Sequence, residues 1–172
     1  MPESSTIERD WHQNTEALLS FVVDLEEDLT TQKPDSMAWS IVESMEHLLA
    51  LEQALGFVFR GRKQQPDRDP EMLIGRIRKV FADDVQKFRA GGPVLPQGQF
   101  QSKQEVVTAF AENREQLLRF AREAGWTNLC LDFNHALFGR LTVTEWIYFC
   151  IYHAARHQRQ MERNAIRLQS QN

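Results

Sequence analysis

Two histidines four residues apart, His153 and His157, are the residues of this sequence with the clearest potential for chemistry. On an α-helix this spacing places both rings on one side, one turn apart. The other residues on that side are mostly apolar, so both imidazoles should face the interior of the protein. A buried imidazole needs a partner, because an unpaired polar group in a core is costly. That partner is either a hydrogen-bonding group or a metal ion.

A third histidine, His47, lies at the edge of the apolar face of another predicted helix. Sites in helical bundles are built from side chains on facing helices, so His47 could join the pair. Three neutral nitrogens suit a divalent ion such as Zn, Ni, Fe or Mn, and they leave a position for water or substrate. On its own, however, His47 is better explained as an ordinary helix-edge histidine.

Two more specific metal motifs are excluded by the residues around these histidines. The metalloprotease motif needs a glutamate directly after its first histidine, and here that position is Ala154. The di-iron bundle motif needs a glutamate three residues before each histidine, and these positions hold Ser44 and Cys150. The sequence therefore predicts neither a zinc protease nor a di-iron protein.

Four predicted helices begin with a capping-box pattern, in which Ser or Thr is followed three residues later by Glu. The pairs are Ser5/Glu8, Ser40/Glu43, Ser102/Glu105 and Thr142/Glu145. Each pair precedes a run of apolar residues with helical period. We expect long helices from about Thr6 to Leu29, Ser40 to Gly61, Ser102 to Ala124 and Thr142 to Arg167.

The remaining segments connect these helices. Asp69-Pro70, a cap followed by proline, predicts a shorter helix whose apolar residues run from Leu73 to Phe88. The Gly- and Pro-rich residues 91–98 predict a long ordered crossover, and residues 126–140 an irregular segment. No alternating strand pattern is present. The chain is therefore predicted to be all-α, with residues 1–172 forming one domain of four long helices and a short extra helix.

Composition narrows the functional classes. A length of 172 residues suffices for one domain, and a net charge of −4 without a basic patch argues against nucleic-acid binding. No segment approaches the ~20 apolar residues needed to span a membrane, and the start lacks the features of a signal peptide. Cys130 and Cys150 are expected to be buried, reduced thiols. We expect a cytoplasmic protein without membrane or nucleic-acid partners.

Two segments resemble the DinB-like superfamily. Residues 39–48, with Trp39-Ser40 and Glu46-His47, resemble its second-helix signature. Residues 138–160, from Phe138-Gly139-Arg140 through the two histidines to Gln160, resemble its last-helix signature. The helix order and the long crossover extend the resemblance over nearly the whole chain.

The resemblance implies an up-down-down-up four-helix bundle, frequently dimeric, that holds a divalent metal through His47, His153 and His157. Characterised members include S-transferases that use low-molecular-weight thiols and a thiol-dependent isomerase. The leading hypothesis is a metal-dependent transferase of a small thiol to an electrophilic small molecule, because a thiol held at the metal becomes the reactive thiolate. Hydrolysis by activated water is the alternative. A metal-stabilised bundle acting through a dimer or partner interface remains a non-catalytic alternative.

Other residues are candidates for supporting contacts. Glu43 could accept a hydrogen bond from an imidazole, although capping its own helix explains it better. His135, in a loop near the expected mouth, could donate a proton or form a fourth contact, although an ordinary loop histidine explains it better. Gln160 could contact a ligand or lie at the surface. Asn113 could point into the bundle and bind substrate.

Three further polar residues are placed outside the site by the same patterns. Arg114 could bind an anionic substrate if it points into the bundle, but we expect it at the rim. Glu46 could support a metal ligand and Cys150 could approach the metal, but we expect Glu46 in solvent and Cys150 in core packing.

Overall fold

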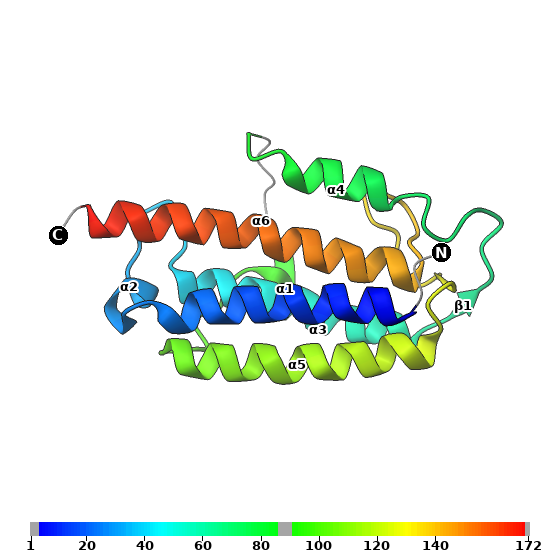
Figure 1. Cartoon of the computed structure of the whole chain (residues 1–172), viewed down its shortest axis with the longest axis horizontal. Coiled ribbons are helices and arrows are strands. Elements are labelled where there is room, and N and C mark those ends of the chain that lie inside the picture. Colours follow the sequence, from blue (N-terminus) through cyan, green and yellow to red (C-terminus); the bar gives the residue numbers. More distant parts are fainter. Residues whose placement is uncertain (1–3, 86–90, 171–172) are drawn as a thin grey trace.

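The computed structural model describes residues 4–85 and 91–170, which fold into a four-helix bundle (Figure 1). The long helices are α1 (Ser4–Asp24), α3 (Ile41–Arg60), α5 (Lys103–Ala124) and α6 (Val143–Gln169). α1 and α6 run in one direction, and α3 and α5 run in the other. Because α3 and α5 are parallel, the chain between them must return along the bundle. The predicted up-down-down-up topology with a long crossover is confirmed.

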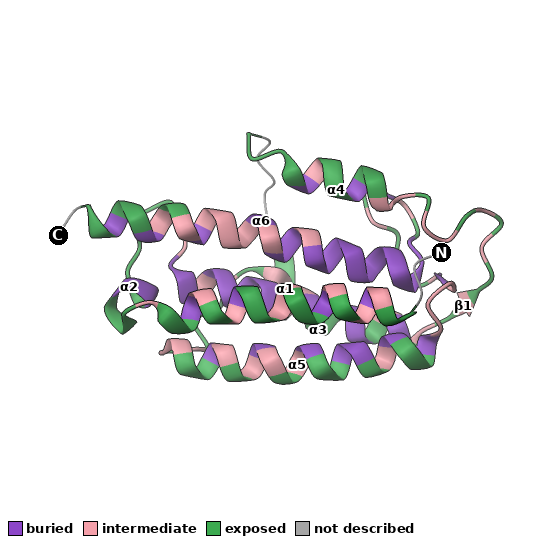
Figure 2. Cartoon of the chain, viewed as in Figure 1, coloured by how far each residue is buried: buried purple, intermediate pink, exposed green. Residues whose placement is uncertain are grey.

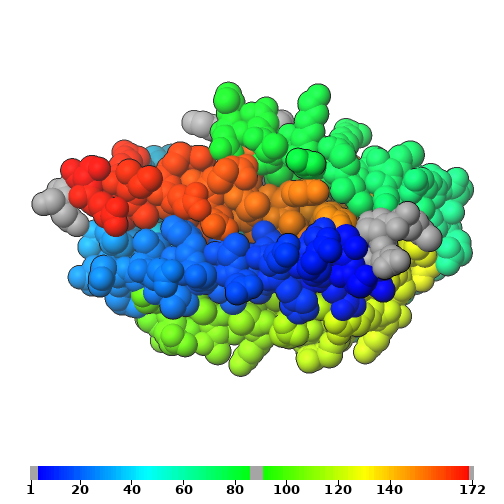
Figure 3. Space-filling model, in the orientation of Figure 1, coloured from blue at the N-terminus to red at the C-terminus, as the bar shows by residue number. Residues whose placement is uncertain are grey.

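The crossover carries two short helices, α4 (Ile74–Ala82) and the 3-10 turn η1 (Gly92–Val94). α4 lies along α6 on the outside of the bundle and forms a ridge in the space-filling view (Figures 1 and 3). None of the described helices has an apolar stretch long enough to cross a membrane.

Buried residues occur along all four long helices (Figure 2). They form two clusters along the bundle, one around Trp11, Phe59 and Trp146 and one around Met45 and Phe110. α6 contributes to both clusters and is the most buried helix over its first half. Cys130 and Cys150 are buried free thiols, as predicted.

A buried ion pair between Glu52 of α3 and Arg114 of α5 crosses the bundle. The Arg114 Nη2 lies 2.7 Å from a Glu52 carboxylate oxygen, and both side chains are almost fully buried. Arg114 also donates to Asn14 Oδ1 (2.7 Å) and Thr15 Oγ1 (2.9 Å) of α1. The Asn14 amide in turn donates to the Ile151 carbonyl of α6 at 3.3 Å. The expectation that Arg114 lies at the rim is wrong, because its charge is paired and hydrogen-bonded inside the core.

Two of the four predicted capping boxes are complete, those of Ser40/Glu43 and Thr142/Glu145. At α5 the box is half formed, because the Glu105 carboxylate accepts from the Gln101 amide and not from Ser102.

The predicted Ser5/Glu8 box is wrong, because α1 already begins at Ser4 and Ser5 lies within the helix. The Glu8 carboxylate instead binds Arg122 of α5 at 2.8 Å.

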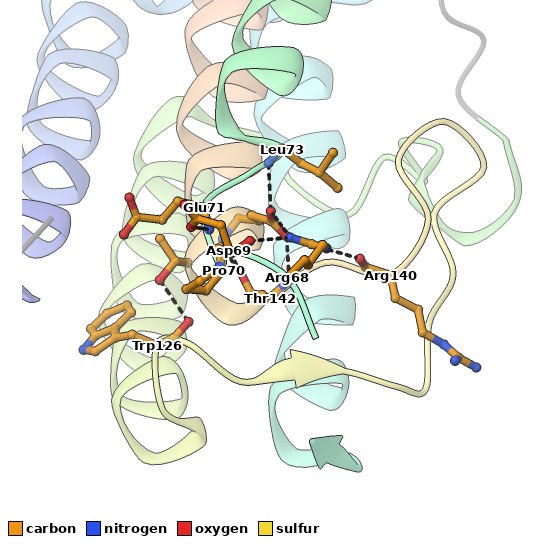
Figure 4. Close-up of polar contacts among 10 residues, drawn as sticks. Arg68, Asp69, Pro70, Glu71, Leu73, Trp126, Arg140 and Thr142 are labelled. Atoms are coloured by element: carbon orange, nitrogen blue, oxygen red, sulfur yellow. Dashed lines mark hydrogen bonds and ion pairs between the residues drawn. The ribbon is translucent and has the colours of Figure 1, made fainter. Parts of the chain in front are cut away.

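The Glu145 carboxylate does more than cap α6. It is fully buried and accepts two hydrogen bonds from Arg68, each 2.7 Å long, and one from the Leu73 amide at 2.9 Å. The Thr142 hydroxyl donates to the Pro70 carbonyl at 2.7 Å, so residues 68–73, directly before α4, are attached to the start of α6 (Figure 4).

This attachment explains why the short helix differs from the prediction. Residues 70–73 form turns held by Asp69 and Glu145, and α4 begins only at Ile74. α4 ends at Ala82, and Val85, expected on its apolar face, is largely exposed. Phe88 lies outside the described residues.

The first predicted helix is also divided. α1 ends at Asp24, and a separate turn, α2 (Glu27–Thr31), brings Leu29 into the core. The Lys103 ammonium donates to the carbonyls of Val23 and Leu25, which satisfies groups that a continuous helix would have used.

A minimal sheet was not predicted. β1 (Lys63–Gln64) pairs antiparallel with β2 (Leu129–Cys130), which is too short to show an alternating pattern. This pair joins the segment after α3 to the segment before α6.

The buried ion pair gives a test of the core. Glu52→Leu or Arg114→Met alone should lower the free energy of unfolding by about 3–5 kcal/mol, because each leaves an uncompensated buried charge. The double variant should lose clearly less free energy of unfolding than the sum of the losses in the two single variants. Denaturant unfolding measures all three.

The control is Arg122→Met, which removes the partly exposed pair with Glu8 and should cost no more than about 1 kcal/mol. If the losses in free energy of unfolding of the two core substitutions simply added up in the double variant, Glu52 and Arg114 would not be a coupled ion pair.

Candidate metal centre

His47 of α3 meets His153 and His157 of α6 inside the bundle. The nitrogen atoms that could act as ligands, one from each ring, all lie within 4.8 Å of one another. The Nε2 atoms of His153 and His157 are 3.1 Å apart. The His47 ring centroid lies 5.4 Å from that of His153 and 4.9 Å from that of His157. The structure therefore brings together the three residues that the sequence nominated.

The orientation of His47 is fixed by the crossover. Its Nδ1 lies 2.7 Å from the Val94 carbonyl oxygen in η1. A carbonyl only accepts, so Nδ1 carries the proton and Nε2 keeps a free lone pair. Trp39 packs against this ring, with centroids 5.0 Å apart, and lies nearly parallel to the ring of His157.

Burial keeps all three imidazoles neutral. Desolvation lowers the pKa of His157 to about 3, and repulsion from His47 and Arg156 adds to the effect. Desolvation also lowers the pKa of His153 well below its usual value, reinforced by His157 and His47. The pKa of His47 is lowered by burial and raised in part by its bond to Val94.

The donor set fits a divalent cation. Imidazole binds metals in its neutral form, and here no proton has to be removed at neutral pH. Two Nε2 atoms at 3.1 Å without a metal need one ring to donate to the other, whereas a shared cation can use both lone pairs. Three neutral nitrogen ligands are typical of catalytic zinc and related sites, and they leave coordination positions open.

Glu46 holds the crossover that orients His47. Its carboxylate accepts hydrogen bonds from three backbone amides, those of Gln97 (2.8 Å), Gly98 (3.1 Å) and Gln99 (3.3 Å). The side chain is buried, so the expectation that Glu46 is solvated is wrong. Consecutive amides without partners in a regular element need an acceptor, and Glu46 supplies it.

A cavity of about 760 Å³ lies beside the three histidines. Its apolar wall includes Leu51, Phe81, Phe149 and Leu137. Phe81 and Phe149 pack on His153, with ring centroids 5.2 and 5.7 Å away. Among residues 4–85 and 91–170, the titratable or amide side chains on the wall, besides the three histidines, are those of Asp84, His135, Arg156 and Gln160. This volume suits a small organic molecule.

The other predicted contacts are divided between the cavity and the rest of the protein. Gln160 lines the cavity and forms a hydrogen bond with His157 that opposes the fall in the pKa of that ring. His135 lines the cavity but is not one of the clustered ligands. Glu43 caps α3 and pairs with Lys33 at 2.8 Å. Asn113 does not line the cavity.

Cys150 is not one of the clustered ligand residues and does not line the cavity, in agreement with its expected role in core packing. Burial raises the pKa of its thiol well above the usual value, and the nearby Glu52 carboxylate adds to the rise.

Sequence reasoning missed the Val94 carbonyl, Glu46 as an anchor, and Arg156 and Asp84 on the cavity wall. Two of these had a local signal, since Glu46 directly precedes His47 and Arg156 directly precedes His157. Val94 and Asp84 had no such signal, because they belong to the crossover and come near the histidines only through the folding of the chain.

A comparison with known protein families shows which family this chain belongs to. The family model of the DinB superfamily matches residues 10–161. The chain belongs to the DinB superfamily. YuaE, an uncharacterized protein of Bacillus subtilis (strain 168), is 27 % identical to this chain over 139 residues, which cover 80 % of this chain and 84 % of YuaE.

Two solved structures share the fold. TT2238, described as a four-helix bundle protein, superposes with a TM-score of 0.60 at 18 % identity and covers 94 % of this chain and 99 % of its own. YfiT from Bacillus subtilis, described as a probable metal-dependent hydrolase with an unusual four-helix bundle topology, has a TM-score of 0.61 at 10 % identity, with 98 % and 91 % covered. At these identities the likeness shows the bundle fold.

The role of Glu46 in holding the crossover can be tested without a metal. Glu46→Gln should speed hydrogen exchange of the amides of Gln97 to Gln99 by about 10- to 100-fold, because it removes the charge and turns an amide NH₂ toward a backbone N–H. Glu43→Gln, one turn earlier on α3, is the control and should leave these amides unchanged. Equal protection in wild type and Glu46→Gln would contradict the anchoring role.

Proposed function

We propose that this protein is a metal-dependent enzyme in which His47, His153 and His157 hold one divalent cation and a small organic molecule reacts in the adjoining cavity. The observation that carries the proposal is the convergence of three neutral ring nitrogens within 4.8 Å at the wall of a cavity of about 760 Å³. A purely structural metal site is usually closed by four protein ligands, whereas this cluster offers three.

The reaction that we propose first is transfer of a small thiol to an electrophile. When bound, the cation would supply positive charge that lowers the pKa of a thiol or water molecule beside it. The three imidazoles add no negative charge to offset this, and Arg156 on the cavity wall adds a further positive charge. The site therefore favours an anionic nucleophile.

The nucleophile should come from a bound molecule, because the described cavity wall offers neither a cysteine nor an unpaired carboxylate. Cys150 is buried away from the cavity, and Asp84 pairs with Arg159 and Arg163, each at 3.0 Å. Phe81 and Phe149 would shield the reacting atoms from water.

Hydrolysis is the second candidate. The specific observation in its favour is the shared bundle fold with YfiT, a probable metal-dependent hydrolase. It needs the same three histidines and a water molecule in place of the thiol. The partners inferred from the sequence, a small thiol, an electrophile and a second copy of the chain, stay predictions.

Metal affinity tests the ligand set. Wild-type protein, purified without an affinity metal column, should bind one equivalent of zinc in competition with a chromophoric chelator. His47→Ala and His153→Ala should each weaken binding by more than about 100-fold, since even residues one step removed from a metal are worth about 10- to 100-fold. His12→Ala, an exposed histidine on α1, is the control and should bind as wild type does.

If wild type takes up no divalent ion, or His153→Ala takes up as much as wild type, the three-histidine site is wrong.

Turnover separates the reactions. With zinc-loaded protein, a thiol such as 2-mercaptoethanol should displace chloride from 1-chloro-2,4-dinitrobenzene faster than it does without protein, and His153→Ala should return the rate to that of the uncatalysed reaction. Thiol-independent cleavage of 4-nitrophenyl acetate would favour hydrolysis. A large zinc-dependent rise in melting temperature without turnover, over a panel of thiols and esters, would instead support the non-catalytic alternative.

A further inference from the structure

His135 is held in place by a tight loop before α6. Its backbone N–H donates to the Gly139 carbonyl at 2.9 Å, and the Gly139 N–H donates back to the His135 carbonyl at 2.8 Å. Gly139 has a φ of +74°, a conformation that glycine adopts without steric cost. The loop is therefore closed on itself and fixes the backbone from which the imidazole projects.

The ring itself is held by a hydrogen bond and by aromatic neighbours. The Leu137 backbone N–H donates to Nδ1 at 3.1 Å. Phe138 stacks on the imidazole, with centroids 4.9 Å apart and planes inclined by 25°. Phe149 of α6 packs edge-to-face against it at 5.2 Å. The loop and α6 thus hold the ring in one orientation.

The bond to Nδ1 determines where the proton sits. A ring nitrogen that accepts a hydrogen bond carries no proton, so the neutral imidazole bears its proton on Nε2. Desolvation lowers the pKa of His135, which keeps this neutral form in place at neutral pH. Within residues 4–85 and 91–170, Nε2 has no hydrogen-bond partner.

His135 lines the same cavity as the three histidines. Phe149 is a ring neighbour of both His135 and His153. His135 is also near enough to contribute to the low pKa of His153. It is nevertheless outside the cluster of ligand nitrogens. A fixed N–H at the wall of a largely apolar cavity is suited to an acceptor on a bound molecule.

We propose that His135 is a substrate-binding residue that donates its Nε2–H to an oxygen acceptor of the molecule in the cavity. The substrate is then a small molecule with an apolar body, which packs against Phe149 and Leu137, and a carbonyl, carboxylate or nitro oxygen that His135 contacts. A neutral imidazole with Nδ1 already occupied cannot accept from the substrate, so a group that can only donate, such as an ammonium, is not recognised at this point. This inference rests on the proposed function only in placing the substrate in this cavity.

The first measurement is made on metal-free protein. Two-dimensional long-range ¹H–¹⁵N spectra of the imidazoles should show His135 as the neutral Nε2–H tautomer at neutral pH. A neutral Nδ1–H tautomer or a charged ring would overturn the proposal. The result does not depend on the metal, so it stands or falls separately from the proposed function.

The second measurement uses phenylacetate, which combines an aromatic ring with carboxylate oxygens, as the probe on zinc-loaded protein. His135→Asn keeps an acceptor at the position of Nδ1 and lacks the distal donor, whereas His135→Gln offers an N–H near the position of Nε2. Calorimetry should show binding weakened about 5- to 10-fold in His135→Asn, the value of one hydrogen bond, and within about threefold of wild type in His135→Gln.

His12→Gln, outside the cavity, is the control and should bind as wild type does. The proposal is overturned if His135→Asn binds phenylacetate as tightly as wild type, if both variants lose the same affinity, or if wild type does not bind the probe. Zinc content measured on the same samples separates this result from the proposed function. If a variant retains zinc but binds phenylacetate more weakly, the loss is due to His135 and not to the metal site. If wild type contains no zinc, the metal site is wrong, but the result for the tautomer of His135 is unaffected.

Discussion

The ion pair between Glu52 and Arg114 is the constraint on which the arrangement of the helices depends. Arg114 reaches Glu52 of α3 and two side chains of α1, and Asn14 extends the network to the Ile151 carbonyl of α6. A buried charge tolerates few alternative positions for its partners, so this network favours one register of the four helices. His47 lies five residues before Glu52, and His153 two residues after Ile151. The same register therefore sets the height at which the three histidines meet.

Much of the fold follows from local rules that the sequence displays. The capping boxes of α3 and α6, the apolar periodicities and the Gly- and Pro-rich crossover predict the four long helices and their connection. The errors occur where a distant side chain decides a boundary. Lys103 ends α1, and Glu145 takes the Leu73 amide and delays α4. Neither contact has a sequence signal, because each joins residues more than 70 positions apart.

In the site, too, features set within one helix can be predicted from the sequence, whereas contacts between distant segments cannot. The spacing of His153 and His157 predicts their proximity on one helix, whereas His47 joins them only through tertiary packing, so the resemblance to a family was needed to group all three. The hydrogen bond from His47 to Val94 and the anchoring of the crossover by Glu46 depend on how a loop returns to α3, which periodicity does not describe. The sequence predicts Arg114 at the rim because charged residues are rarely buried, although a partner on another helix can hold such a residue in the core.

The central claim is that three imidazoles, and no sulfur, surround one cation. X-ray absorption spectroscopy of the zinc-loaded protein tests it most directly, because multiple scattering from imidazole rings counts them and sulfur is distinguished by its longer bond to zinc. The account predicts three imidazoles completed by light-atom ligands in wild type, and two in a His47→Ala sample loaded at high zinc concentration. A first shell that contains sulfur, or a wild-type spectrum with one imidazole or none, would contradict it.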